Sequence, residues 1–247
     1  MPELTYQEAL KYLYSLTQSG IKLGLNNTSL LLQYFGEPQL HGRTIHIAGT
    51  NGKGSTAAMI ESILSTSGYK VGLYTSPHLL DFRERVQINR KMIEKHQTLE
   101  LITRIKSAVE ELGIAITFFE FTTVLAFLYF NEQNTDINII EVGLGGRLDA
   151  TNLCQAEISI ITSISRDHTQ YLGEDLEQIA FEKASIIKES GTVFAHIPEE
   201  ELFEVVNNLA RKRSANLYRL GMDFQVAPEA ENEGNNAFSF KSDSWAL

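Results

Sequence analysis

The fold of this chain is decided by the stretch Ile45-His46-Ile47-Ala48-Gly49-Thr50-Asn51-Gly52-Lys53-Gly54-Ser55-Thr56. Apolar residues typical of a strand run into a glycine-rich loop, and a helical pattern follows. The glycines let backbone N–H groups surround phosphate oxygens at the positive end of that helix. Lys53 adds a point charge, and the hydroxyl of Ser55 or Thr56 can reach Mg²⁺. Residues 49–56 therefore predict a polyphosphate site, with ATP as the ligand.

The loop departs from the generic P-loop pattern G-x-x-x-x-G-K-[ST]. Ile47 occupies the first glycine position, and Gly54 separates Lys53 from Ser55. The alternative is a glycine-rich turn that binds nothing. That reading is weaker, because lysine, glycines and hydroxyls rarely fall together by accident between a β-branched run and a helical pattern.

The composition limits the classes of function. With 247 residues and 43% hydrophobic content, the chain can bury the core of one large domain or two small ones. A net charge of −10 argues against nucleic acid or an anionic membrane as the main partner. The single cysteine, Cys154, excludes an intramolecular disulfide and fits a reducing compartment. We find no signal peptide or membrane-spanning run, so we expect a cytoplasmic location. We also expect a monomer that acts on small molecules.

The pattern along the chain predicts an α/β fold. A helix over residues 5–18 and a second that ends near Phe35 open the chain. Strands are then expected at 44–48, 70–74, 137–142, 158–164, 192–196 and 216–219, and helices at 54–67, 98–112, 119–131, 175–188 and 199–211. This alternation predicts a mostly parallel sheet with helices on both faces. We expect one ATP-binding domain: a helical segment (1–42), an α/β core (43–222) and a terminal hairpin or tail (223–247).

Polar groups follow several of these strands where they end. They are the phosphate loop, Thr75-Ser76-Pro77-His78, Glu141 and Asp167-His168. Because the carboxyl ends of parallel strands share one edge of a sheet, these groups are expected to meet there. Phosphate cradle, hydroxyl, carboxylate and imidazole are the parts that metal-assisted phosphoryl transfer requires.

Each of these groups also has a structural interpretation. Ser76 before Pro77 is typical of a turn, and His168 fits an ordinary loop histidine. Glu141 is harder to explain structurally, because a carboxylate that closes an apolar strand is costly to bury without a cation. A metal ion would meet that need, so Glu141 is the strongest of these candidates.

Lys183 gives an independent indication. In the expected helix 175–188 it falls four residues after Ile179 and four before Ile187, on the apolar stripe. One interpretation is a lysine that snorkels to the rim. The other is a desolvated amine with a depressed pKa, which can react with CO₂ to give a carbamate that holds a second metal ion.

The run Gly143-Leu144-Gly145-Gly146-Arg147-Leu148-Asp149 resembles a dinucleotide-binding loop only weakly. Leu148 replaces the third glycine, and no helix obviously begins there. A tight loop that brings Arg147 and Asp149 towards the phosphate edge suits the chain better.

Together these motifs resemble the N-terminal ATPase domain of the dihydrofolate synthase/folylpolyglutamate synthase family, in the Mur ligase superfamily. The matching segments are 49–56, 74–79, 83–89, 117–120, 141–152, 167–168, 172–173 and 179–188. The resemblance implies a P-loop NTPase-like Mur ligase central domain. It also implies ATP-dependent ligation, in which a pteroate or folate carboxylate becomes an acyl phosphate that the amine of L-glutamate attacks.

The resemblance also implies residue roles. Residues 49–56 would bind the phosphates of ATP, and Lys53, His168 and Lys183 would take part in catalysis. One or two Mg²⁺ ions would be held by Ser55, Ser76, Glu141, His168 and Lys183, the last as a carbamate. Phe119, Glu120, Arg147 and Asp149 would contact the substrate. Residues 75–90 correspond to a mobile loop over the active site.

The sequence departs from this family in places. Ser185 and Arg90 stand where glycine is usual. A C-terminal ligase domain present in the family is expected to be absent from these 247 residues. We therefore keep two alternatives to the folate ligase: a nucleotide-binding module without turnover, and a Mur-type cell-wall ligase, which Gly54 and 117–120 disfavour.

Overall fold

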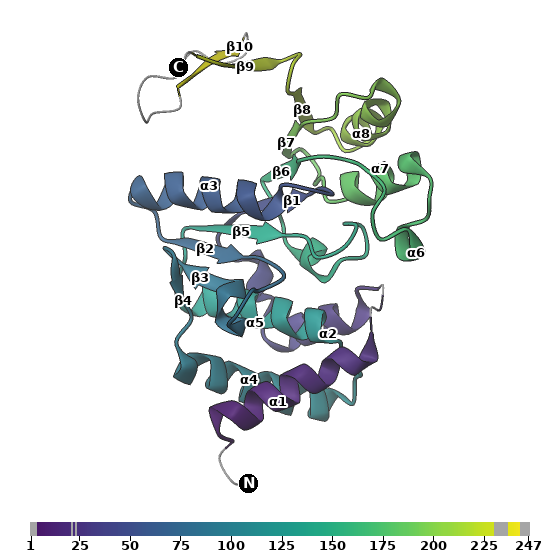
Figure 1. Ribbon diagram of the computed structural model, residues 1–247. Coiled ribbons are helices and arrows are strands. Elements are labelled where there is room, and N and C mark those ends of the chain that lie inside the picture. The colour runs from purple at the N-terminus through teal and green to yellow at the C-terminus, as the bar shows by residue number, and fades with distance from the viewer. Residues whose placement is uncertain (1–3, 21, 23, 230–236, 243–247) are drawn as a thin grey trace.

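The computed structural model describes residues 4–20, 22, 24–229 and 237–242 (Figure 1). Eight strands form one sheet in the order β4-β3-β2-β5-β1-β6-β7-β8. They are β1 (Arg43–Ala48), β2 (Val71–Tyr74), β3 (Val86–Ile88), β4 (Lys91–Met92), β5 (Ile137–Glu141), β6 (Ile158–Ile161), β7 (Thr192–Ala195) and β8 (Asn216–Arg219). From β2 to β8 all neighbours pair in parallel. The predicted α/β fold with a mostly parallel sheet is confirmed.

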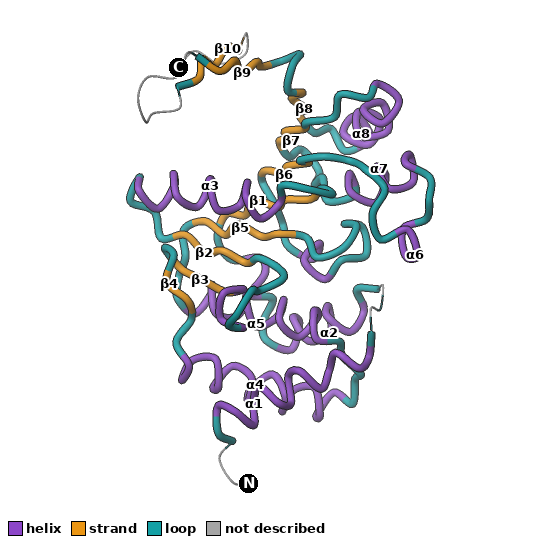
Figure 2. Tube along the Cα trace, viewed as in Figure 1, coloured by secondary structure: helices purple, strands orange, loops and turns teal. Residues whose placement is uncertain are grey.

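Helices precede, connect and follow these strands (Figure 2). They are α1 (Tyr6–Ser15), α2 (Asn26–Tyr34), α3 (Lys53–Thr66), α4 (Lys95–Leu112), α5 (Phe118–Glu132), α6 (Thr169–Leu172), α7 (Leu176–Ala184) and α8 (Glu200–Lys212). Short 3₁₀ turns lie at Leu16–Ser19, Pro38–Leu40, Phe82–Arg85 and Ala150–Leu153. None of the described helices is both long enough and apolar enough to span a bilayer.

The two faces of the sheet are covered by different helices. Ile45 and Ile47 of β1 pack with α3, which lies alone above the centre of the sheet in Figure 1. Helices α1, α2, α4 and α5 form the large core on the opposite face. Helix α5 is buried nearly all round from Glu120 to Phe130, as expected for a helix inside a core. Helices α7 and α8 pack against β6 and β7 in a second core.

Two predicted boundaries were wrong. The strand expected at 158–164 ends at Ile161, and the helix expected at 175–188 ends at Ala184. The opening helix expected at 5–18 is α-helical to Ser15 and continues as the 3₁₀ turn Leu16–Ser19. Carbonyl groups at the end of α7 accept hydrogen bonds from other segments: Glu182 from the N–H of Arg147, and Ser185 from Arg213. These partners lie far away in the sequence, so the local pattern could not indicate them.

The antiparallel strands β3 and β4 were missed by the sequence analysis. They are very short, and they meet at Asn89 and Arg90, whose φ angles of 47° and 62° are left-handed. That conformation favours glycine, the residue that the family resemblance leads us to expect at position 90. Arg90 has a compensating contact, because its Nε donates to Oε2 of the buried Glu61 at 3.1 Å.

A separate two-stranded antiparallel sheet follows the main one. It consists of β9 (Phe224–Pro228) and β10 (Phe238–Ser242). The rest of the expected hairpin or tail, at 230–236 and 243–247, lies outside the described residues. The division of the chain into 1–42, 43–222 and 223–247 stays a prediction.

Candidate functional site

A cavity of about 380 Å³ lies at the carboxyl ends of β2 and β5, beside the phosphate loop. Six residues that the sequence analysis proposed for the site line this cavity: Lys53, Ser76, Phe119, Glu120, Asp149 and His168. The rest of its wall is formed by Gly20, Lys22, Gly24, Pro77, Arg85, Thr117, Phe118, Gly143, Leu144, Leu148 and Ala150. The parallel sheet thus brings together groups that are more than 100 positions apart in the chain.

The phosphate loop is held in shape by the segment after β6. The N–H of Thr50 donates to the carbonyl of Ser163 at 2.9 Å, and the N–H of Asn51 donates to Ser163 Oγ at 3.0 Å. Gly49 and Gly52 have φ angles of 153° and 85°. A Cβ atom on Gly49 would overlap Thr162 Oγ1. The loop therefore requires glycine at position 49 for both conformation and space.

The start of α3 fits an anion. Gly52 is the N-cap, and no side chain caps the helix, so its first N–H groups lack the usual side-chain acceptor. Lys53 Nζ lies over the loop, where it donates to the carbonyls of Gly49 and Thr50 at 3.0 and 3.2 Å. Ser55 in the first turn is exposed, and Thr56 is half-buried. This combination of helix terminus, glycine loop and lysine suits a phosphate group.

Glu141 ends β5 as a buried carboxylate without a cationic partner. It is 4% exposed, and its only hydrogen bond in the described part of the chain comes from the N–H of Ser76, 3.0 Å from Oε2. Burial raises the pKa of Glu141, although this hydrogen bond and the charges of Lys53 and Arg85 oppose the shift. A divalent cation would remove the cost of burying this charge.

The other candidate metal ligands do not form a conventional cluster. Across the described ranges, no group of three or more His, Cys, Asp or Glu side chains is arranged to hold a metal ion. His168 is half-exposed at the N-terminus of α6, with Nε2 3.6 Å from Asp167 Oδ2. The roles of Ser55, Ser76, His168 and Lys183 as metal ligands stay predictions.

Lys183 is buried, as its place on the helical stripe predicted. Lys183 is only 4% exposed, and its amine has no hydrogen-bond acceptor among the residues that the structure describes. Burial and, to a smaller extent, the charge of Lys53 lower the pKa of Lys183 to about 8, although the charge of Asp167 opposes the shift. Lys183 is therefore a desolvated amine that is influenced by the charge of the phosphate-loop lysine.

Glu120 is held by structural contacts. Its Oε2 accepts from the N–H of Thr117 at 2.8 Å and its Oε1 from the hydroxyl of Thr28 at 3.2 Å, which fixes the start of α5. Phe119 packs closely against Gly143, where a Cβ atom would overlap its ring. Both residues line the cavity, and the Glu120 carboxylate already accepts two hydrogen bonds from the chain.

Of the two predicted substrate contacts in the loop after β5, Asp149 lines the cavity and Arg147 does not. Arg147 is absent from the described cavity wall, and its Nε donates to Glu182 Oε1 at 2.9 Å. Asp149 lines the cavity and accepts from the N–H groups of Leu144 and Thr151 at 2.8 and 3.0 Å. The structure thus brings Asp149 to the cavity wall, whereas Arg147 forms an ion pair with Glu182.

Sequence reasoning missed the importance of Arg85. This residue is 8% exposed and lines the cavity, yet its contacts in the described residues are Nε to His78 Nδ1 at 2.7 Å and the Phe118 ring, 5.0 Å from Cζ. It has no carboxylate partner in that part of the chain. A buried guanidinium without a carboxylate is suited to an anionic ligand. Nothing in the local pattern distinguishes Arg85 from Arg83, which is partly buried and pairs with Asp81.

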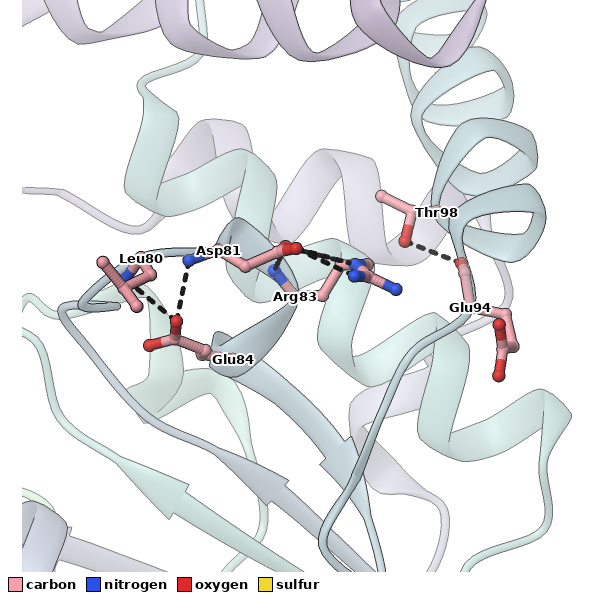
Figure 3. A network of polar contacts seen from close by, with 6 residues as sticks. All are labelled: Leu80, Asp81, Arg83, Glu84, Glu94 and Thr98. Carbon is pink, nitrogen blue, oxygen red and sulfur yellow. Dashed lines mark hydrogen bonds and ion pairs between the residues drawn. The ribbon is translucent and has the colours of Figure 1, made fainter.

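Hydrogen bonds to the carboxylates of Asp81 and Glu84 stabilise the loop that carries Ser76 and Arg85 (Figure 3). Glu84 accepts from three successive backbone N–H groups, those of Leu79, Leu80 and Asp81, at 2.7 to 2.9 Å. These bonds lower the pKa of Glu84. The family resemblance predicts a mobile loop here, whereas this conformation has a defined set of internal hydrogen bonds.

Comparison with known proteins identifies the family. A family model described as the Mur ligase middle domain matches residues 47–244. This chain belongs to the Mur ligase family. The Mur ligase chain is 37% identical over 243 residues to the dihydrofolate synthase/folylpolyglutamate synthase of Bacillus subtilis, covering 96% of this chain and 56% of that protein.

Solved structures agree with this assignment. Folylpolyglutamate synthase from Thermotoga maritima superposes with a TM-score of 0.87 at 40% identity, over 96% of this chain and 55% of that one. An Escherichia coli relative in complex with DHPP and ADP gives 0.86 at 35% identity, over 100% and 58%. The resemblance seen in the motifs is confirmed. The chain spans little more than half the length of these relatives.

Two glycines of the phosphate loop are expected to respond oppositely to alanine. Gly49→Ala should lower the free energy of unfolding by about 1–3 kcal/mol, because of overlap with Thr162 and strained φ. Gly54→Ala should raise it by up to about 1 kcal/mol, because Gly54 is helical and the added Cβ would lie 3.5 Å from Glu141 Oε2. Urea denaturation measures both, and equal effects would show that the loop geometry is wrong.

Proposed function

We propose that this chain is the nucleotide-binding part of an ATP-dependent ligase. The ligase joins a pteroate or folate carboxylate to L-glutamate through an acyl phosphate. The observation that carries the proposal is that the phosphate loop and an aromatic, cationic wall face one cavity of about 380 Å³. Its volume is in the usual range for a small-molecule site. The relatives named above, one of them bound to ADP and DHPP, support this choice of reaction.

In this proposal each wall of the cavity has one task. The phosphates of ATP lie over the N-terminus of α3, beside Lys53. The aromatic part of the substrate lies against Phe118 and Phe119, and its carboxylate is drawn towards Lys53 and Arg85. The carboxylate oxygen then attacks the terminal phosphorus, and ADP leaves. Fixed cations that face the reacting oxygens supply positioning and charge stabilisation.

Mg²⁺ would be held by Glu141 with the hydroxyls of Ser55 and Ser76, and a second ion by His168 and the carbamate of Lys183. The ions would neutralise charge on the transferred phosphoryl group. Glu141 fits this role because its carboxylate is buried and lacks a cation. Lys183 fits because its amine is desolvated and near Lys53.

The proposal is tested by two variants that affect different ligands. Lys53→Ala should weaken ATP binding by about 10- to 100-fold, since a charge-assisted phosphate contact is worth about 1.5–3 kcal/mol. Arg85→Ala should weaken pteroate binding by a similar factor and change ATP affinity little. Isothermal titration calorimetry on folded proteins measures both, and Lys106→Ala on α4 serves as the control. Unchanged ATP affinity in Lys53→Ala would reject the phosphate role.

We also expect Lys183 to carry a carbamate. Only a neutral amine attacks CO₂, and a pKa of about 8 leaves about one tenth of the amine neutral at pH 7, against roughly one in 2,500 for an ordinary lysine. Modification should therefore increase as the pH rises from 6 to 8. A carbamate signal in ¹³C NMR with labelled bicarbonate measures it.

Lys188 provides the matched control for this measurement. It is also a buried lysine with a lowered pKa, but its Nζ donates to the carbonyl and Oδ1 of Asn152 at 2.7 and 2.9 Å. The signal should disappear in Lys183→Ala and remain in Lys188→Ala. A signal that survives in Lys183→Ala would contradict the assignment.

A further inference from the structure

A line of three side chains runs from the centre of the sheet to the cavity. His46 on β1 and Thr151 in the turn Ala150–Leu153 are fully buried, and Asp149 is 5% exposed on the cavity wall. His46 Nε2 lies 2.8 Å from Thr151 Oγ1, which is hydrogen-bonded to Asp149 Oδ1. The proposed function gives His46 and Thr151 no role.

The direction of these hydrogen bonds follows from the chemistry of the groups. An ionised carboxylate only accepts, so the single hydroxyl proton of Thr151 is donated to Asp149. Thr151 Oγ1 must then accept from His46, whose proton lies on Nε2. The other ring nitrogen, Nδ1, is therefore bare. It is buried and has no partner among the described residues.

Because Nδ1 has no partner, donation from His46 through Thr151 to Asp149 is favoured over donation in the opposite direction. If Asp149 bound a proton on Oδ1 and donated it to Thr151, the hydroxyl could respond in two ways. It could accept from both neighbours, which leaves its own proton without an acceptor, or donate to His46 Nε2, which moves the imidazole proton to the unpartnered Nδ1. Either arrangement buries a donor without an acceptor among the described residues, which costs free energy. A charged imidazolium is no alternative, because burial lowers the pKa of His46 well below its usual range.

Asp149 needs such support, since burial raises its pKa to about 6. Backbone N–H groups of Leu144 and Thr151 oppose that shift. The other titratable groups that interact with Asp149 are the Tyr74 phenol and the Cys154 thiol, and burial raises the pKa of each. Neither supplies a positive charge. The hydroxyl of Thr151 is thus the one side-chain donor to Asp149 in the described structure.

We propose that His46 is a positioning residue that acts through Thr151 to hold Asp149 as an oriented anionic acceptor for an N–H or amino group of the substrate. A carboxylate offers about four acceptor sites, and the hydrogen bonds from the Leu144 N–H, the Thr151 N–H and the Thr151 hydroxyl occupy three of them, so one site is left for such a donor. The inference rests on the proposed function only in the choice of an amino-substituted heterocycle as the ligand.

The test follows the titration of the Asp149 carboxyl by NMR of the full chain with ¹³C-labelled aspartate. Asp149→Asn assigns the signal. In folded His46→Phe and Thr151→Val the midpoint should rise by about one pH unit, a tenfold change in proton affinity. Thr151→Ser, which keeps the hydroxyl, should restore it. Ser159→Ala is the control, because Ser159 lies beside His46 on β6 and its hydroxyl donates to Ile186 instead.

An unchanged midpoint in folded Thr151→Val would overturn the proposal, and the Thr151 pair decides it even if His46→Phe fails to fold. Calorimetry adds a functional measurement: His46→Phe should weaken pteroate binding about three- to tenfold at pH 6.5 and leave ATP affinity unchanged. Equal losses for both ligands would also overturn it. Failure of the wild-type chain to bind ATP would instead reject the proposed function. The NMR titration of Asp149 does not require ATP binding, so the two failures can be distinguished.

Discussion

Glu141, a buried carboxylate with no ion-pair partner among the described residues, is the constraint on which the rest of the site depends. It lies opposite Ile47 in the parallel register of β5 and β1, so it shares the face on which α3 packs. The phosphate loop leaves β1 only two residues after Ile47. Parallel pairing of two strands therefore sets an unpaired negative charge directly beside an anion-binding loop. The two are compatible when a cation lies between them.

Other features of the site can be understood from this arrangement. Gly54 in the first turn of α3 lies directly beside the Glu141 oxygens, because a Cβ atom at this position would lie in ordinary contact with them. The Ser76 N–H fixes one of those oxygens. Lys53, Lys183 and Arg85 surround the same region without carboxylate partners in the described structure. An acidic chain thus concentrates unpaired cations where phosphate and substrate would bring negative charge.

The sequence predicted features that depend on local periodicity. Apolar strands with reactive ends gave the sheet and the position of Glu141, and a helical stripe gave the burial of Lys183. Features that depend on distant partners could not be predicted. Glu120 binds Thr28, and Arg147 binds Glu182, so their contacts become visible only in three dimensions. Arg85 could not be predicted for a different reason: its importance follows from the lack of a carboxylate partner among the described residues, which only the structure shows.

The site roles themselves stay predictions, and the central one can be measured directly. The account requires that Glu141 interact with nucleotide through a metal ion. Titration of ATP into wild type and Glu141→Gln, each with Mg²⁺ and with EDTA, separates metal-dependent from metal-independent affinity. The account predicts that Mg²⁺ strengthens binding markedly in wild type and little in Glu141→Gln, with similar affinities in EDTA. An equal response to Mg²⁺ in both proteins would show that Glu141 is structural and would contradict the account.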